Sequence, residues 1–397
     1  MKNIFFLIFL IIFILSGCGK LVDAKGFNDF LTNPPSAEDD DNSDNGSGSG
    51  SWIAVGQSEF TMGEAKHPSI AVLNGEPVVA FQDVAYGNKL TVMKYNSSNN
   101  SWSALGIAGV SDGEAADIVL KIKGLDIYVA FKDVVNSNSI TVMKYSAGNW
   151  SVVGNKGFTA SSVNSFDMEI NNNGEIFVAC HTGDLKLYSW NGSTWSLVSS
   201  TSSNNCYYMS LEFDSNNIPY VGFTINSSTS RVMRYYNSSW EIVSPDPYPD
   251  AYPKTKLVIK DDLPMIVVGN STTYLLSRIF TGTNWQSLGA TSYFLCDLIM
   301  NAGGDSYLSS VRAFDAFSTG SRVFIVGGFY SPNGSDYVKP DGTYALIYKN
   351  DTWSALGNKI CDKSYDYKQS ISATDSYVFV AVCAYPNNKL SVYKYAY

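Results

Sequence analysis

Two histidines and six cysteines are the first candidates for chemistry in this 397-residue chain, because imidazole and thiol groups serve as proton carriers, nucleophiles and metal ligands. Neither His67 nor His181 has a partner at a spacing typical of metal sites. Cys180 and His181 are neighbours, but adjacent residues of a strand point to opposite faces, so a Cys-His dyad is not predicted. The HExxH, GxSxG and P-loop patterns are absent. The sequence therefore predicts no metal site, no cofactor and no catalytic residue.

Acylation is the chemistry that the N-terminal residues indicate. Residues 4–14 form an unbroken apolar run, and Leu15-Ser16-Gly17-Cys18 follows it. The run is short for a membrane-spanning helix, which needs about 20 residues. Its ending resembles the lipobox of bacterial lipoproteins. The resemblance implies a signal peptide at residues 1–17, acylation of Cys18 and anchoring in a membrane. Because Gly19 rather than aspartate follows, it also implies sorting to the outer membrane.

Composition divides the rest of the chain into a tether and one folded domain. Residues 18–50 are acidic and rich in Gly and Ser, so they cannot bury a core, and we expect a flexible tether. Residues 51–397 form the folded domain. The net charge of −9 and the pI of about 4.8 exclude nucleic acid as a favoured partner. The five cysteines after Cys18 cannot all pair within the chain, and those in apolar runs, Cys180 and Cys383, are expected to be buried thiols.

Tryptophan marks a repeat across the folded domain. Seven of the eight tryptophans recur at intervals of 45 to 50 residues, with one longer interval of 68 residues before the last. Five copies read Trp-x-x-Leu/Val-Gly, and two have serine in place of the glycine. Periods of this length are typical of β-propellers and solenoids. The repeated positions are Trp52, Trp102, Trp150, Trp195, Trp240, Trp285 and Trp353.

Three further strand-like segments occur in each period. One is apolar and rich in β-branched or aromatic residues, as in Val78-Val79-Ala80-Phe81, and another alternates apolar and charged residues, as in Val92-Met93-Lys94-Tyr95. A leading segment precedes both, and pairs such as Asn74-Gly75 mark the turns. Asp83 and Asp133 end second segments, and we expect them to cap the turns that follow. Four strands in about 45 residues correspond to one propeller blade.

The ends of the chain predict how the ring closes. The domain begins with a tryptophan strand, Trp52 to Gly56, and finishes at Tyr397 after a third strand. We therefore expect the N-terminal strand to complete the last blade, which removes an open sheet edge. The count gives an all-β, seven-bladed β-propeller with four-stranded blades, and we expect it to be monomeric.

The repeat resembles the propeller repeats of exported bacterial proteins with a YVAF-x-D, VMKY and W-x-x-LG pattern, over residues 51–397. This resemblance implies an architecture and no activity. The Trp-x-x-Leu-Gly rhythm is also similar to that of seven-bladed fucose-binding bacterial lectins, although no sugar-binding residue can be transferred from them.

Tyrosine is unevenly distributed over the loops. Loops after the fourth strand and loops between strands two and three emerge on one face of a propeller, and loops often carry function. The loops after the first three tryptophan strands lack tyrosine, whereas later ones carry many. Packing between blades is the alternative explanation, but packing should repeat in every blade. A binding site is therefore predicted at Tyr207, Tyr208, Tyr248, Tyr252, Tyr293, Tyr330, Tyr365 and Tyr367.

Together these features predict a lipid-anchored cell-envelope protein whose propeller face binds a glycan or a protein ligand. The acidic background favours neutral glycans or a basic protein surface. Two alternatives remain open, a scaffold subunit of an outer-membrane assembly and an enzyme that acts on glycans with residues drawn from several blades.

Overall fold

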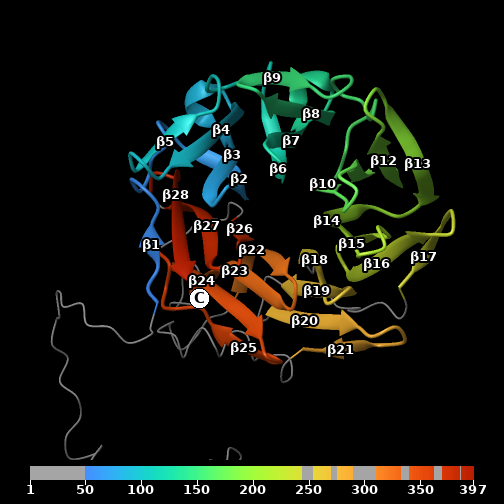
Figure 1. Ribbon diagram of the computed structural model, residues 1–397. Helices are drawn as coiled ribbons and strands as arrows, with labels where there is room; N and C mark the ends of the chain where they lie inside the picture. Colours follow the sequence, from blue (N-terminus) through green and yellow to red (C-terminus); the bar gives the residue numbers. More distant parts are fainter. Residues whose placement is uncertain are drawn as a thin grey trace, which may run out of the picture. The chain divides into compact units, whose positions relative to one another are not determined.

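Seven four-stranded antiparallel sheets surround a central channel in the computed structural model of the chain (Figure 1). The all-β, seven-bladed propeller is therefore confirmed. The structure describes residues 50–243, 254–269, 275–288, 310–331, 339–361, 369–384 and 386–397. The predicted signal peptide, Cys18 and nearly all of the predicted tether lie outside these residues.

Blades 1 to 3 follow one another along the chain, and their strands pair in sequence order. Blade 1 comprises β2 (Ala65–Leu73), β3 (Glu76–Asp83), β4 (Lys89–Asn96) and β5 (Ser101–Ala104), with the 3-10 turn η1 (Val84–Tyr86). Blade 2 comprises β6 (Ala115–Lys123), β7 (Asp126–Asp133), β8 (Ser139–Ser146) and β9 (Asn149–Val152), with η2 (Val134–Asn136). Blade 3 comprises β10 (Phe166–Ile170), β11 (Ile176–His181), β12 (Asp184–Trp190) and β13 (Trp195–Ser202).

Blades 4 to 6 repeat the same order. Blade 4 comprises β14 (Cys206–Phe213), β15 (Pro219–Ile225), β16 (Thr229–Tyr236) and β17 (Ser239–Ile242). Blade 5 comprises β18 (Lys254–Lys260), β19 (Leu263–Gly269), β20 (Leu275–Phe280) and β21 (Trp285–Ser287). Blade 6 comprises β22 (Ser310–Thr319), β23 (Arg322–Ser331), β24 (Lys339–Lys349) and β25 (Thr352–Ala355). Its hairpins therefore take up part of the long sixth interval of the sequence.

Blade 7 joins the two ends of the folded domain. It comprises β26 (Ser370–Ala373), β27 (Tyr377–Ala384), β28 (Lys389–Ala396) and, as its outer strand, β1 (Ile53–Ala54). Ile53 pairs with Lys394 and Ala54 with Tyr393 in antiparallel register. The predicted closure by the N-terminal strand is confirmed.

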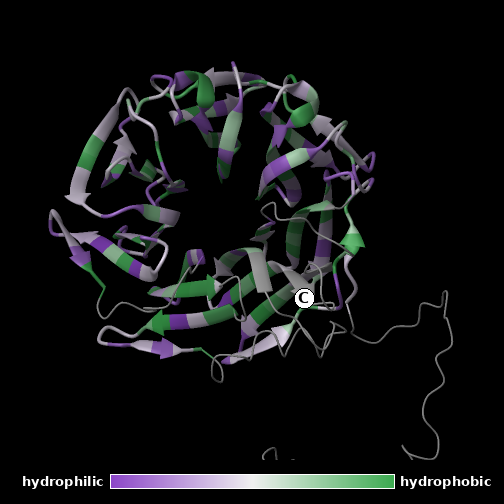
Figure 2. Cartoon of the chain, turned by 180° about the vertical axis from the view of Figure 1, so that it is seen from behind, coloured by the Kyte–Doolittle hydropathy of each residue, from purple (hydrophilic) through white to green (hydrophobic). Residues whose placement is uncertain are grey.

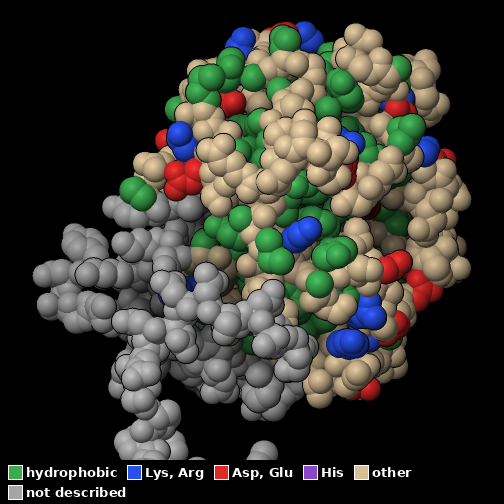
Figure 3. All heavy atoms as spheres, turned by 60° about the vertical axis from the view of Figure 1, so that its left-hand side comes forward, with side chains coloured by type: hydrophobic (Ala, Val, Ile, Leu, Met, Phe, Trp, Pro, Cys, Tyr) green, Lys and Arg blue, Asp and Glu red, His purple; other side chains and the backbone are tan. Residues whose placement is uncertain are grey.

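The hydrophobic core is divided into seven layers, one between each pair of neighbouring blades. In the first of these layers, Val78 and Ala80 of blade 1 pack with Val129 and Phe131 of blade 2. Figure 2 shows hydrophobic and hydrophilic residues mixed along the strands. Second strands such as β3 and β15 are buried on both faces, because each sheet lies between two neighbours. On the side seen in Figure 3, basic and acidic side chains of the described residues are interspersed over the outer surface.

The repeated tryptophans link each blade to the one before it. The indole N–H of Trp150 donates to the Leu105 carbonyl of the preceding blade at 2.7 Å, and five other tryptophans make the equivalent bond. Gly106 follows the acceptor with φ +76°, and a Cβ there would lie 3.0 Å from Trp150 Cδ1. The Trp-x-x-Leu/Val-Gly repeat is thus explained, because the glycine gives both the left-handed backbone and the room that the next indole needs.

Trp240 is the exception among these tryptophans, since its indole N–H has no hydrogen-bond partner among the residues that the structure describes. The preceding outer strand, β13, has a bulge at Val198, where the acceptor carbonyl would lie, and pairs on to Ser202. Serine stands at 199 instead of the motif glycine. The strand therefore does not turn away at the point that the indole hydrogen bond requires.

Candidate functional site

The first strands of the seven blades enclose a cavity of about 930 Å3 in the central channel. Their registers with the second strands place equivalent residues at two heights, which we call the first ring and the second ring. The first ring consists of Ser69, Val119, Asp167, Ser210, Lys256, Asp315 and Ser370. The second ring lies two residues further along each strand and consists of Ala71, Lys121, Glu169, Glu212, Val258, Phe317 and Ser372.

Polar side chains of the first ring join neighbouring blades. A first strand is the free edge of its sheet, so its outward N–H groups need partners from elsewhere. In four blades a first-ring oxygen accepts a hydrogen bond from a backbone N–H of the next first strand. The pairs are Ser69 with Leu120 (3.0 Å), Asp167 with Leu211 (3.0 Å), Asp315 with Ile371 (3.2 Å) and Ser370 with Ile70 (3.2 Å). The first ring thus has a structural role.

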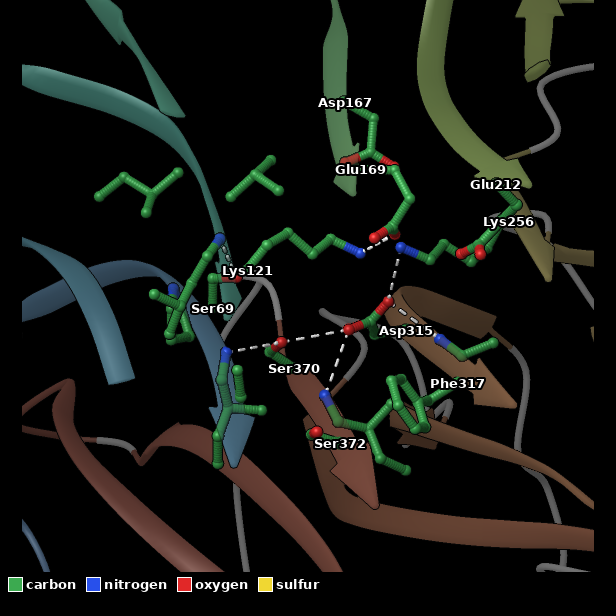
Figure 4. A pocket seen from close by; sticks show the side chains of 18 of the residues that line it. Ser69, Lys121, Asp167, Glu169, Glu212, Lys256, Asp315, Phe317, Ser370 and Ser372 are labelled. Carbon is green, nitrogen blue, oxygen red and sulfur yellow. Dashed lines mark hydrogen bonds and ion pairs between the residues drawn. The ribbon is translucent and has the colours of Figure 1, made fainter. Parts of the chain in front are cut away.

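The second ring adds charged side chains to the channel. Lys121 forms an ion pair with Glu169, whose other carboxylate oxygen accepts from the Ile170 N–H at 2.8 Å. Within the described residues the carboxyl group of Glu212 has neither a hydrogen bond nor an ion pair. Figure 4 shows Lys121, Glu169, Glu212 and the first-ring Lys256 converging on the channel. Lys256 itself pairs with Asp315 at 3.2 Å.

The charged groups of the channel shift one another's pKa values. The pKa of Glu212 is raised to about 8, first by burial and then by the Glu169 carboxylate, while Lys121 and Lys256 lower it in part. Burial alone would lower the pKa of Lys121, but the carboxylates of Glu169 and Glu212 raise it above its ordinary value. The pKa of Lys256 is raised against the effect of burial by Asp315 and Asp167. At neutral pH both lysines are charged and Glu212 is largely protonated.

Strained backbone marks the mouth of the channel. Four first strands carry a β-bulge near their beginning. In three of these bulges one residue is left-handed, with φ 50° at His67, 49° at Asp117 and 52° at Tyr208. Such residues cost roughly 1–3 kcal/mol each and cluster at ligand sites, where bulges re-aim side chains. All three line the cavity.

Polar and aromatic groups combine at this mouth. Asp117 forms an ion pair with Lys132 at 2.7 Å, and the other carboxylate oxygen lies 3.7 Å from His67 Nδ1. Tyr208 is 47% exposed, and Lys254 Nζ lies 5.9 Å from the centre of its ring. The mouth therefore offers hydrogen-bonding groups beside an accessible aromatic face.

The predicted tyrosines are only partly described. Tyr207 and Tyr208 lie at the beginning of β14, rather than in the loop before it, and both line the channel mouth. Tyr330 lies near the end of β23. The other predicted positions, Tyr248, Tyr252, Tyr293, Tyr365 and Tyr367, lie outside the described residues. A binding role for the eight tyrosines stays a prediction.

Asp83 caps the turn after its strand, as predicted, whereas Asp133 makes no side-chain capping bond to the backbone of η2 and contacts that turn through a side chain. Asp83 accepts a hydrogen bond from the Ala85 N–H at 3.1 Å and one from the Thr91 hydroxyl at 2.9 Å. Asp133 accepts from the Asn136 amide at 2.8 Å and from the Thr141 hydroxyl at 2.7 Å. Both aspartates are buried, so their oxygens serve the turn rather than a ligand.

Buried thiols and histidine make no catalytic pair in the described residues. Burial raises the pKa of Cys180 to about 12, so it stays a thiol, and Cys383 is also buried and free. The His181 ring contacts the Asn164 side chain, with Nδ1 3.2 Å from the amide nitrogen. The described residues include no cluster of three or more His, Cys, Asp or Glu arranged to bind a metal. They also include no helix of the length and hydrophobicity needed to cross a membrane.

The channel residues Lys121, Glu169, Glu212 and Lys256 were not expected from the sequence. A signal was present, because the leading strands alternate charged and apolar residues, as in Phe166-Asp167-Met168-Glu169-Ile170. Charge on one face of an otherwise apolar inner strand indicates a polar channel.

Solved structures share this fold. The chain is similar to an ulvan lyase, from a new family of polysaccharide lyases, bound to -[GlcA(1-4)Rha3S]-; identity is 12%, coverage 86% of this chain and 95% of the other, and the TM-score 0.52. It is also similar to a mutant of the Aleuria aurantia lectin in complex with Fucalpha1-6GlcNAc. Here the sequence identity is 15%, the match covers 78% of this chain and 100% of the lectin chain, and the TM-score is 0.50. No protein-family model and no curated protein sequence matches the chain. At these identities the likeness shows the fold alone.

Proposed function

We propose that the protein is a lipid-anchored cell-envelope protein whose propeller binds a glycan in the central channel and at its mouth. The second ring is the observation that carries this proposal. Its charged and aromatic side chains, Lys121, Glu169, Glu212 and Phe317, face a cavity of about 930 Å3. Small-molecule sites usually occupy about 300–1,000 Å3 and combine apolar surface with a few polar groups.

The available groups suit a saccharide. Sugar hydroxyls need hydrogen-bond donors and acceptors, which Glu212 and Ser372 offer, while the rings of Phe317 and Tyr208 offer flat apolar surface for the C–H face of a sugar. The fold adds support, since the similar lectin and lyase structures each contain a saccharide. The predicted tyrosines outside the described residues belong to the same proposal, as a second group of aromatic side chains for the ligand.

The anchor is part of the proposal because the Leu15-to-Cys18 ending resembles a lipobox. Acylated Cys18 would hold the chain in a membrane, which we propose to be the outer membrane, and residues 19–50 would separate the propeller from its surface.

A glycan array probed with the mature protein in mild detergent tests the function. We expect saccharides to bind to the protein. We expect Tyr208→Ala to lower the affinity for the best ligand by about fivefold or more, because an aromatic side chain that contacts a ligand can contribute about 1 kcal/mol or more to binding. Tyr236→Ala is the matched control, since Tyr236 is 41% exposed on the outer part of the same blade. Absence of any saccharide binding, or equal losses in the two variants, would contradict the proposal.

A glycan-active enzyme is the second candidate, because Glu212 carries a proton at neutral pH as a general acid must. Incubation of the protein with the polysaccharides that it binds, followed by measurement of new chain ends, tests this candidate. Activity that survives Glu212→Gln would assign catalysis to other groups.

A further inference from the structure

The cavity in the central channel extends along the first strands from one end to the other. Its wall includes residues at the beginning of these strands, such as His67 and Tyr207, and residues beyond their ends, such as Gly75 and Asn172. Residues 67–72 of β2 all line it, and at about 3.3 Å per strand residue the lined length is roughly 20 Å. The cavity is therefore a passage along the propeller axis.

The passage is narrow for its length. Spread over roughly 20 Å, the volume of about 930 Å3 gives a mean cross-section on the order of 45 Å2. An extended saccharide chain that lies along the axis presents one ring at each height, whereas a branch point presents two rings at the same height. A branch therefore doubles the cross-section that the ligand needs, and the passage favours an unbranched chain.

One wall of the passage carries groups that a neutral sugar can contact. Ser372 of β26 is 5% exposed and lines the cavity, and its hydroxyl makes no hydrogen bond to a described residue. A buried hydroxyl without a partner lowers stability, so a ligand hydroxyl that bonds to it is favoured. Phe317 of the neighbouring blade lies beside Ser372 at the channel (Figure 4). The two side chains together offer a hydrogen bond and a flat apolar surface to one sugar ring.

Most charged side chains of the passage already have partners within the protein. Lys121 pairs with Glu169, and Lys256 pairs with Asp315. Asp167 accepts hydrogen bonds from two backbone N–H groups, at 2.9 and 3.0 Å. A charged ligand group would compete with these contacts, whereas a neutral chain leaves them in place. The passage therefore favours a ligand without charge.

We propose that the central channel binds a linear, neutral glycan lengthwise, with one sugar unit at Ser372 and Phe317 and the chain leaving at the mouth beside Tyr208. This inference rests on the proposed glycan-binding function and names the class of glycan as unbranched chains of several units. Each further unit of such a chain meets a new height of the passage. The affinity therefore rises with chain length until the passage is filled, and a branched glycan reaches only the mouth.

Binding of the mature protein, in mild detergent, to an array of synthetic neutral oligosaccharides tests the inference. The array carries linear chains from disaccharide to hexasaccharide and, for each chain, an analogue branched at the second unit from the free end. We expect the hexasaccharide of the preferred series to bind about tenfold or more tightly than its disaccharide, because the added units make contacts inside the passage. The branched analogues should bind no more tightly than the disaccharide.

Two variants fill the passage at the second ring. Ser372→Phe and Ala71→Phe each add a large side chain, from blades 7 and 1, at positions that line the cavity. Each variant should remove the dependence on chain length, so that the hexasaccharide binds no more tightly than the disaccharide. Ser239→Phe is the matched control, because Ser239 is exposed on the outer strand β17. This control should keep the full dependence on chain length.

Thermal melting shows which of the variants are folded. If neither Ser372→Phe nor Ala71→Phe folds, Ser372→Ala decides, because it removes the free hydroxyl without filling the passage. It should lower the affinity for the hexasaccharide by about fivefold, as expected for the loss of one hydrogen bond. An unchanged affinity of Ser372→Ala overturns the inference.

The other outcomes separate the inference from the function. Equal binding of linear and branched chains, equal binding of short and long chains, or a length dependence that survives in the folded phenylalanine variants overturns the lengthwise binding and leaves glycan binding intact. An array on which no saccharide binds overturns the proposed function as well.

Discussion

Replacing Gly106 by alanine tests how the blades are held together. At φ +76° an alanine costs roughly 1–2 kcal/mol more than glycine because of left-handed backbone strain. Its Cβ would also lie 3.0 Å from Trp150 Cδ1, so the indole must move. That movement weakens the 2.7 Å hydrogen bond to the Leu105 carbonyl, worth about 1 kcal/mol. We expect Gly106→Ala to lower the free energy of unfolding by about 2–3 kcal/mol.

Two matched comparisons isolate the contribution of the indole. Gly124 has φ +61° and nothing within 4 Å of an added Cβ, so Gly124→Ala carries only the backbone cost. Trp150→Phe removes a hydrogen bond, whereas Trp240→Phe removes an indole N–H that makes none within the described part of the chain. We expect Trp150→Phe to lower the free energy of unfolding by about 1 kcal/mol more than Trp240→Phe does.

Equilibrium unfolding in urea, followed by circular dichroism, measures all four variants against the wild-type protein. If Gly106→Ala and Gly124→Ala are equally destabilised, the close contact with the indole has no energetic effect. If Trp240→Phe is as costly as Trp150→Phe, the indole hydrogen bond does not link the blades.

Three further predictions concern the channel, the closure and the anchor. The pKa of Glu212 is about 8 in the folded chain against an ordinary 4.5, so the folded state holds an extra proton between these values and its stability falls as pH rises through that window. Glu212→Gln should remove this slope and raise the free energy of unfolding above pH 8 by at most about 5 kcal/mol, and an unchanged slope in urea unfolding would show that another group is responsible. Deleting residues 51–56 should lower the free energy of unfolding by about 3–5 kcal/mol or more, because the outer strand and the buried surface of Trp52 are lost. Deleting residues 20–50 should leave the free energy of unfolding almost unchanged. Equal melting temperatures of the two deletion variants would contradict this prediction. Cys18→Ser should yield a chain without labelled palmitate that no longer partitions into detergent, and a variant that still does both would refute lipidation.

The number of blades and their closure could be predicted from the sequence because both depend on local patterns. Each blade needs the same apolar strand, the same turns and the same tryptophan, so the period appears in the sequence as a repeat of about 45 residues. The split blade followed from where the first tryptophan strand and the last third strand lie. The cap at Asp83 was also predictable, since an aspartate reaches the backbone only a few residues away, whereas the capping expected of Asp133 is wrong because its carboxylate binds the Asn136 side chain instead.

The candidate site could be predicted only in part. Tyr207 and Tyr208 were singled out from an uneven distribution of tyrosine, and they do lie at the channel mouth. The left-handed bulges beside them could not be placed from the sequence, because Asp and His are enriched at positive φ but still adopt negative φ at most positions.

By itself, the sequence determined the architecture, since repeated local preferences and a repeated apolar pattern leave one way to bury every blade. The charged channel was decided by the tertiary structure. Lys121, Glu169, Glu212 and Lys256 come from four blades and interact only because ring closure brings the first strands together at matching heights. Electrostatic energy depends on the distance and burial of each pair of charges. Neither quantity is contained in the spacing of residues along the chain, so the raised pKa of Glu212 and the site built around it exist only in the folded propeller.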